Sequence, residues 1–187
     1  MQNQASNFNE FSLLSRLFGN LYYRNPKDSV LTNVFAWLQQ GGLQNAWALE
    51  EDKATKEAFA SLQMKIDPNA LAEEYDYLFG TEGKASTQIS SIIDLDELAA
   101  FREERAMPQL ENSDHVAGLL LTAAWIEDNV DSTQAQTQFF QQFLLPVSAK
   151  WLPLVEQQAR LPFYRQLAYL TRELLSAMAD ELEEETE

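Results

Sequence analysis

The side chains best suited to chemistry in this sequence are a neighbouring pair, Asp114 and His115. His115 is the single histidine, and an adjacent acid can orient an imidazole for proton transfer. The pair opens an apolar stretch that continues to Ile126. An acid there would be stabilised by the positive end of a helix dipole. The pattern therefore allows either acid–base catalysis or polar recognition at the edge of an apolar core.

Other catalytic signatures are missing from the sequence. It has no Gly-rich phosphate loop, no His-Glu-x-x-His and no G-x-S-x-G. It also lacks cysteine, which excludes disulfides, thiol catalysis, iron–sulfur clusters and cysteine-bound zinc. A metal on His115 would need carboxylates from distant helices, because Leu119, one turn later, is no ligand. We predict no catalytic residue, no metal site, no cofactor and no enzyme activity. The alternative is a small helical hydrolase or metal-dependent enzyme using His115 and Asp114.

Two interpretations of the pair stay open at this point. In the structural one, Ser113 and Asp114 cap the helix, Asp114 favours the dipole from the first turn, and His115 is a partly buried filler. In the functional one, Asp114 and His115 form a polar anchor beside an apolar groove. The acid would then accept a hydrogen bond from a bound peptide. The spacing does not decide between them.

Charge limits the partners that such a chain can have. Twenty-nine acids against thirteen bases give a formal charge of −16. This charge repels nucleic-acid phosphates and anionic membranes and attracts basic protein segments, so we predict no nucleic acid and no membrane insertion. The start, MQNQASNFNE, lacks the basic and apolar regions of a signal peptide, which predicts a cytoplasmic protein.

Helical periodicity runs through the whole chain, and no alternating pattern is long enough for a strand. We predict an all-α fold, a single domain over residues 1–187, with roughly eight or nine helices around a buried central helix, Ser113–Ile126. The boundary signals are Asn7 or Asn9, Asp28 or Ser29, Gly41-Gly42, residues 51–65, Pro68 with Gly80, Asp94, Met107-Pro108, Ser132-Thr133, Pro146 and Pro162. Pro153 is expected to kink the helix that follows Pro146 or to lie near its start.

Two stretches carry no such signal. Residues 81–91 are polar and predict the longest loop, where longer loops are often functional. Residues 180–187 hold six acids and predict an acidic tail into which the last helix frays.

Aromatic residues suggest a further site. Tyr75, Leu78 and Phe79 share one helical stripe, which is usually core. Trp125, one of four tryptophans, is also expected in the core, although tryptophan at a groove edge often anchors a partner.

Several segments resemble the TorD/DmsD/NarJ family of redox-enzyme maturation chaperones. EYDYLFG, residues 74–80, resembles the family signature E-Y-x-x-L-F-x-G, and Asp114-His115 resembles its D-H motif. The final third is similar to the family's closing pattern, with a Phe-rich helix, a proline turn, and Phe-Tyr before a Leu-rich helix. With the opening FSLLSRLFGNLYYRNP, the resemblance covers essentially the whole chain.

The resemblance implies a non-enzymatic cytoplasmic chaperone. Family members bind redox enzymes, usually molybdenum-cofactor oxidoreductases, and many recognise a twin-arginine signal peptide and delay export until the cofactor is inserted. By position, Tyr75, Leu78, Phe79, Asp114 and His115 would line or support the peptide site, and we add Trp125 as a client contact. The predicted partner is a client apo-metalloenzyme or its leader peptide, and a plain interaction adaptor is the alternative.

The resemblance also implies an oligomeric behaviour, because some members exchange segments between protomers. We predict a monomer with a possible segment-swapped dimer, with a hinge near residues 81–91.

Departures from the family pattern indicate a divergent branch. KASTQISS lacks the prolines and the tyrosine that often follow the first motif, and Leu119-Leu120-Leu121 replaces an acid that commonly follows D-H. Ser113 and Val147 stand where the family often has proline and tryptophan. The client is therefore predicted to be a different metalloenzyme, with or without a signal peptide.

Overall fold

The computed structural model describes residues 4–186, and every regular element in that range is helical, which confirms the all-α prediction. The α-helices are α1 (Gln4–Tyr23), α2 (Thr32–Gln39), α3 (Gly42–Ala46), α4 (Lys53–Gln63), α5 (Pro68–Phe79), α6 (Leu95–Glu103), α7 (Val116–Asn129), α8 (Thr133–Phe139), α9 (Leu145–Gln158) and α10 (Pro162–Thr186). A 3-10 turn (Ser29–Leu31) leads into α2, and a π-helical turn (Phe140–Leu144) joins α8 to α9. Counting α8 to α9 as one run, the described residues form nine helical runs, as predicted.

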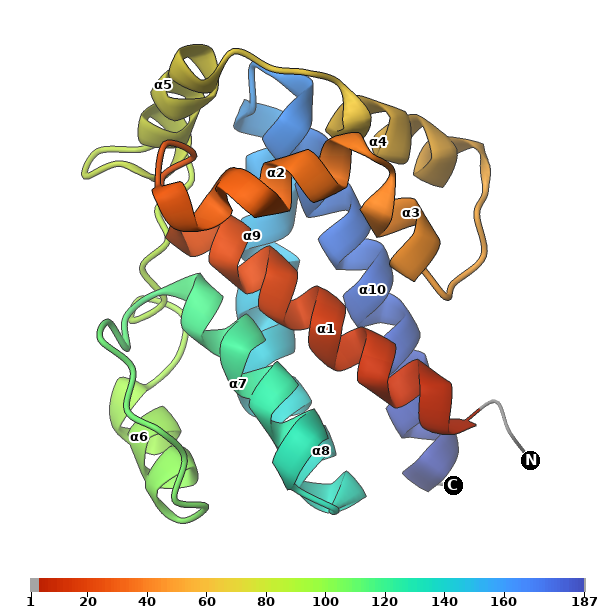
Figure 1. Cartoon of the computed structure of the whole chain (residues 1–187). Coiled ribbons are helices and arrows are strands. Elements are labelled where there is room, and N and C mark those ends of the chain that lie inside the picture. Colours follow the sequence, from red (N-terminus) through yellow and green to blue (C-terminus); the bar gives the residue numbers. More distant parts are fainter. Residues whose placement is uncertain (1–3, 187) are drawn as a thin grey trace.

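The bundle is built on the pairing of α1 with α7, which lie side by side (Figure 1). Small residues on one face of α1 let the two backbones approach. Ser15 donates a hydrogen bond of 2.7 Å to the Leu120 carbonyl, and Ser12 donates one of 3.4 Å to Ala124. One turn further, Gly19 faces Leu121 so closely that a Cβ there would lie 3.2 Å from it. α9 and α10 pack behind this pair, and α2 to α5 cross one end of the bundle.

The apolar stretch forms the predicted central helix. Nine of the fourteen residues of α7 are buried, and only Leu121, Trp125 and the polar C-terminal end reach partial or full exposure. The helix starts at Val116, so Ser113 to His115 precede it. Among the described helices, none is long and apolar enough to cross a membrane.

Most predicted helix boundaries are confirmed. Asp28, Asp94 and Ser132 accept hydrogen bonds from the first turns that they precede, and Pro68 occupies the first turn of α5. Gly41 adopts φ +81°, the left-handed conformation that glycine favours at a helix end. The short helix α3, which follows at once, was not predicted.

Two boundary predictions are wrong. α1 begins at Gln4, so Asn7 and Asn9 do not mark its start. Pro146 does not separate two helices, since it lies in the first turn of α9, where a missing N–H is tolerated. Pro153, expected to kink this helix or to lie near its start, lies inside α9, and the kink stays a prediction.

The acidic C-terminal stretch does not fray where predicted. α10 continues to Thr186, and Glu187 alone of this stretch lies outside the described residues. Leu182 is buried, and Thr133 at the start of α8 donates a 3.1 Å hydrogen bond to the Glu185 carboxylate. Packing against α8 therefore stabilises a helix end that its charges alone would disfavour.

The first prediction tests the central helix. Leu120→Ala removes a side chain of α7 that is buried in the core and should lower the free energy of unfolding by about 2–5 kcal/mol. The matched control is Leu13→Ala on α1, where the side chain is 49% exposed and the cost should stay within about 0.5 kcal/mol. Urea unfolding measures both, and equal midpoints for the two variants would contradict the central position of α7.

Candidate functional site

Asp114 lies just before α7 and holds the preceding loop. Its Oδ1 accepts hydrogen bonds from the backbone N–H of Ile89 at 2.7 Å and of Ser90 at 2.9 Å, and its Oδ2 accepts one from the Ser90 hydroxyl at 2.9 Å. Partial burial alone would raise the Asp114 pKa, but these hydrogen bonds and the neighbouring imidazole lower it overall. The expected position in the first turn of α7 is wrong, and the carboxylate tethers a segment 24 residues away.

His115, not the Ser113-Asp114 pair, is the N-cap of α7. Its Nδ1 accepts a 3.0 Å hydrogen bond from the Ala117 N–H, which places the ring proton on Nε2 in the neutral form. The ring packs edge-on against Tyr23 at 5.2 Å and is only 8% exposed. Burial lowers the pKa of His115 to about 4, against the opposing influence of Asp114. The imidazole is therefore neutral at pH 7, with one nitrogen committed to the helix start.

The predicted loop is confirmed as the longest stretch between described helices, Gly80–Asp94. Three buried residues face inward, namely Ala85, Thr87 and Ile89, and they alternate with exposed Ser86, Gln88 and Ser90. The Ala85 carbonyl accepts from the Trp151 indole at 3.2 Å, and the Thr87 carbonyl accepts from the Val116 N–H at 2.9 Å. The loop thus has a fixed backbone and an outward polar edge, while the hinge stays a prediction.

Tyr75 joins α5 to the end of α1. Its hydroxyl lies 2.9 Å from the carbonyl oxygens of both Tyr22 and Tyr23, in the last turn of α1, where carbonyls lack helical partners. Burial, with Asp76 and Tyr23 nearby, raises the pKa of Tyr75 to about 12. The hydroxyl is therefore a permanent donor at neutral pH.

Leu78 and Phe79, the other two residues of the stripe, are buried. Phe79 packs against Tyr22, Trp151 and Tyr164, with ring centroids 5.2–6.1 Å apart. The Leu78 carbonyl accepts the Ala85 N–H at 2.8 Å. Both side chains therefore belong to the core beneath the loop that follows α5 and are not themselves available to a partner.

Tyr23 connects these predicted residues, since its carbonyl faces Tyr75 and its ring faces His115. We call Tyr75, Asp114, His115 and the loop Gly80–Asp94 the α7 corner. In Figure 1 it lies where the end of α1, the start of α7 and the loop after α5 meet. Trp125 does not belong to it, because it lies half-exposed about 14 Å further along α7.

Glu74 was part of the matched motif, but its role was not predicted. The side chain is 1% exposed and accepts hydrogen bonds from the N–H groups of Arg160 and Leu161 and from the Arg160 guanidinium. Arg160 also stacks on the Tyr77 ring at 3.7 Å. Glu74 thereby fixes the turn before α10 to α5.

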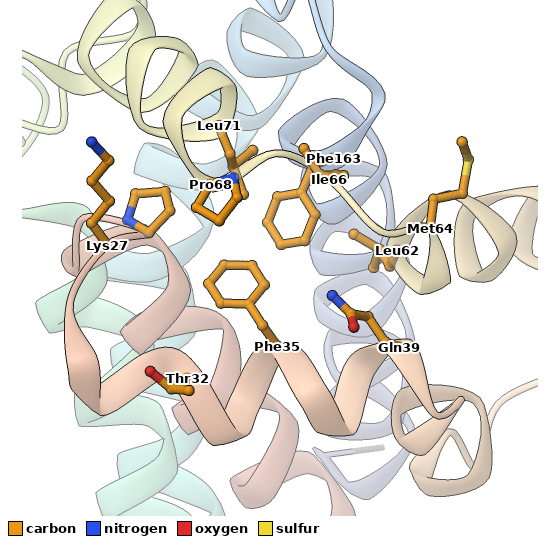
Figure 2. Close-up of a pocket in the computed structure, with 11 residues that line it drawn as sticks. Lys27, Thr32, Phe35, Gln39, Leu62, Met64, Ile66, Pro68, Leu71 and Phe163 are labelled. Atoms are coloured by element: carbon orange, nitrogen blue, oxygen red, sulfur yellow. The ribbon is translucent and has the colours of Figure 1, made fainter.

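A groove beside α5 and the start of α10 was also not predicted. It has a cavity volume of about 310 Å³ and opens between α2, the α4–α5 connection and the start of α10 (Figure 2). Its floor residue Phe163 packs on Tyr164, which in turn contacts Tyr75 and Phe79. The residues that line it are Pro26, Lys27, Thr32, Phe35, Gln39, Leu62, Met64, Ile66, Pro68, Leu71 and Phe163.

Acidic side chains crowd the far end of α7. Burial raises the pKa of Glu127 to about 7, and Glu181, Asp128 and Glu185 add to the shift. Within the described part of the chain, no three acidic or histidine side chains are arranged to hold a metal ion.

Comparison with known proteins decides the family. The chain is 39% identical to chaperone protein YcdY of Escherichia coli, over 96% of this chain and 99% of that protein. The chain belongs to the TorD/DmsD family of redox-enzyme maturation chaperones. It is also 25% identical to the probable Tat proofreading chaperone DmsD of Haemophilus influenzae, over 87% and 86% of the two chains. An uncharacterized protein of the same organism is 60% identical over 95% of this chain. No protein-family model matches the sequence.

The second prediction concerns pH. The folded pKa of His115, about 4, lies below the unfolded value of 6.5, so acidification between them favours the unfolded state. The effect of Glu127 on stability has the opposite sign, because its folded pKa of about 7 exceeds the unfolded value of 4.5. The folded state takes up the proton first, so acidification between these values favours the folded state. Relative to the wild type, His115→Asn should therefore gain stability on acidification from about pH 7 to about pH 5, since asparagine can cap but not titrate.

Glu127→Gln is the counterpart variant. Its gain in the free energy of unfolding over the wild type should be largest near about pH 8 and should vanish near about pH 4, below the unfolded pKa. Chemical denaturation across this range measures both differences. If the free energy of unfolding changed with pH in the same way for the wild type and both variants, the buried environments assigned to His115 and Glu127 would be contradicted.

The third prediction concerns the tether. Asp114→Asn replaces the charged oxygen that accepts both backbone N–H groups by a neutral amide oxygen, which is a weaker acceptor. The Ile89 and Ser90 amides should therefore exchange hydrogen faster, while the Leu119 amide inside α7 stays protected. Glu82→Gln, at an exposed acid in the same loop, is the control. Unchanged exchange at Ile89 and Ser90 in Asp114→Asn would show that the loop is held by other contacts.

Proposed function

We propose that this protein is a cytoplasmic, non-enzymatic chaperone that binds one client apo-metalloenzyme, a redox enzyme or its leader peptide, and keeps it in a state that accepts its cofactor. The observation that carries the proposal is the tethered loop of the α7 corner. Its backbone is fixed by Asp114, Val116 and Trp151, and its polar side chains face outward. A fixed polar edge can bind a partner without a large ordering cost.

Charge supports the same proposal. The formal charge of −16 favours a client surface or leader that carries basic residues, such as a twin-arginine segment. Asp114 itself is largely committed, since three of the roughly four lone-pair sites of a carboxylate already accept hydrogen bonds. It contributes by fixing the loop, and at most one site is left for a client donor.

The hydrolase alternative finds no support in this geometry. General-base catalysis by His115 would have to use Nε2, because Nδ1 accepts from the Ala117 N–H. The ring is buried against Tyr23, and its low pKa makes it a weak base. The names of the chaperone relatives agree with a binding role.

The fourth prediction tests the function. Affinity purification of the wild-type protein from its cells, with mass spectrometry, should enrich one redox or other metalloenzyme over an unrelated acidic helical protein. Deleting the chaperone should lower the cofactor occupancy of that enzyme, whereas a plain adaptor would leave it unchanged. No enriched metalloenzyme, or unchanged occupancy, would refute the proposal.

A variant pair localises the client. Gln88→Arg adds a positive charge on the exposed edge of the loop and should reduce client recovery by repelling a basic segment. Gln141→Arg adds the same charge at an exposed position in the π-helical turn and should leave recovery unchanged. Equal recovery with both variants would move the client away from the α7 corner.

A further inference from the structure

We propose that the groove between α2, the α4–α5 connection and α10 binds an apolar helical segment of the client whose end carries an acidic residue that pairs with Lys27. This inference rests on the proposed function and deepens it by naming a second surface and the chemistry that the surface selects.

The lining of the groove suits apolar side chains. Phe35 and Phe163 contact each other along it, with ring centroids 5.6 Å apart, and Leu62 and Leu71 form buried walls. A cavity of about 310 Å³ is at the lower end of ligand-pocket sizes, enough for a few side chains of a partner helix. Met64 on the rim is 62% exposed, and a flexible thioether adapts to varied apolar partners. These features match the binding of one helical face in a groove.

Lys27 supplies the polar selection. It is the only charged residue among those that line the groove, on a protein with a formal charge of −16. Its neighbour Asp28 is engaged with Arg24 at 3.1 Å and with the Val30 N–H, so it is not committed to Lys27. In Figure 2, Lys27 and Met64 lie at opposite ends of the groove, with the two phenylalanine rings between them. A bound helix would therefore place apolar residues over the two rings and a carboxylate beside Lys27.

The occupant is a client segment and not a second copy of this chain. Two copies would each bring a charge of −16 to the interface, which disfavours self-association. Beneath the surface, the groove floor is linked to the α7 corner by the ring contacts of Phe163, Tyr164 and Phe79. The buried motif residue Phe79 thus connects the support of the groove floor with that of the loop.

The test uses the full-length protein and three fluorescein-labelled peptides, observed by fluorescence anisotropy. Each peptide carries leucines along one helical face, and they differ one turn beyond the last leucine, where they have glutamate, glutamine or lysine. The wild type should bind the glutamate peptide most tightly. Thr32→Trp fills the groove from an exposed position and should weaken binding about tenfold, whereas Asn33→Trp, exposed on the same helix but outside the lining, should not.

Charge reversal provides the second arm. Lys27→Glu should weaken the glutamate peptide about fivefold and strengthen the lysine peptide, while Lys150→Glu, an exposed control on α9, should change neither. Tightest binding of the lysine peptide to the wild type would overturn the inference in favour of a basic leader. Equal binding by the Thr32→Trp and Asn33→Trp variants would overturn it as well, as would a concentration-dependent dimer that Thr32→Trp abolishes.

The two proposals fail separately. If the wild type enriches a metalloenzyme from cells but the peptides bind equally to the wild type and Thr32→Trp, only the groove assignment fails. If the glutamate peptide binds as expected but no metalloenzyme is enriched, the groove is a peptide site and the maturation function is refuted.

Discussion

The structure depends on the hydrogen bonds that allow α7, an almost wholly apolar helix, to begin near the surface. The first N–H groups of a helix have no intrahelical partners and are costly to bury unpaired. At the start of α7, the Thr87 carbonyl takes the N–H of Val116 and the His115 imidazole takes that of Ala117. Asp114, directly before them, is then free to hold Ile89 and Ser90. The same few hydrogen bonds that permit the core helix therefore also fix the exposed edge of the loop.

A second set of hydrogen bonds fixes the end of α1 and the turn before α10 to α5. The Tyr75 hydroxyl binds the last carbonyls of α1, and Glu74, one residue earlier, holds the turn before α10. α5 thus fixes the ends of two helices, and those helices carry the groove floor at Phe163 and the ring of Tyr23 that covers His115. Residues of the family motif are consequently structural supports for two surfaces that the client is proposed to use.

Much of the fold could be predicted from local signals, because helix periods and the caps at Asp28, Asp94 and Ser132 need no distant partner. The family motifs also led to Tyr75, Asp114 and His115, but not to their roles. Asp114 bonds a segment 24–25 residues away, Glu74 bonds one 86–87 residues away, and Leu182 is buried only because α10 meets α8. The groove draws its lining from several separate segments, so no single stretch of sequence could reveal it.

The most direct test of the central claim, that the client docks on the α7 corner, is photo-crosslinking in living cells. A photoreactive amino acid at Ser86, on the exposed edge of the loop, should capture the metalloenzyme that co-purifies with the wild type. The same probe at Gln142, exposed in the π-helical turn, should not. A client captured equally from Gln142, or captured from neither position while it still co-purifies, would contradict the account.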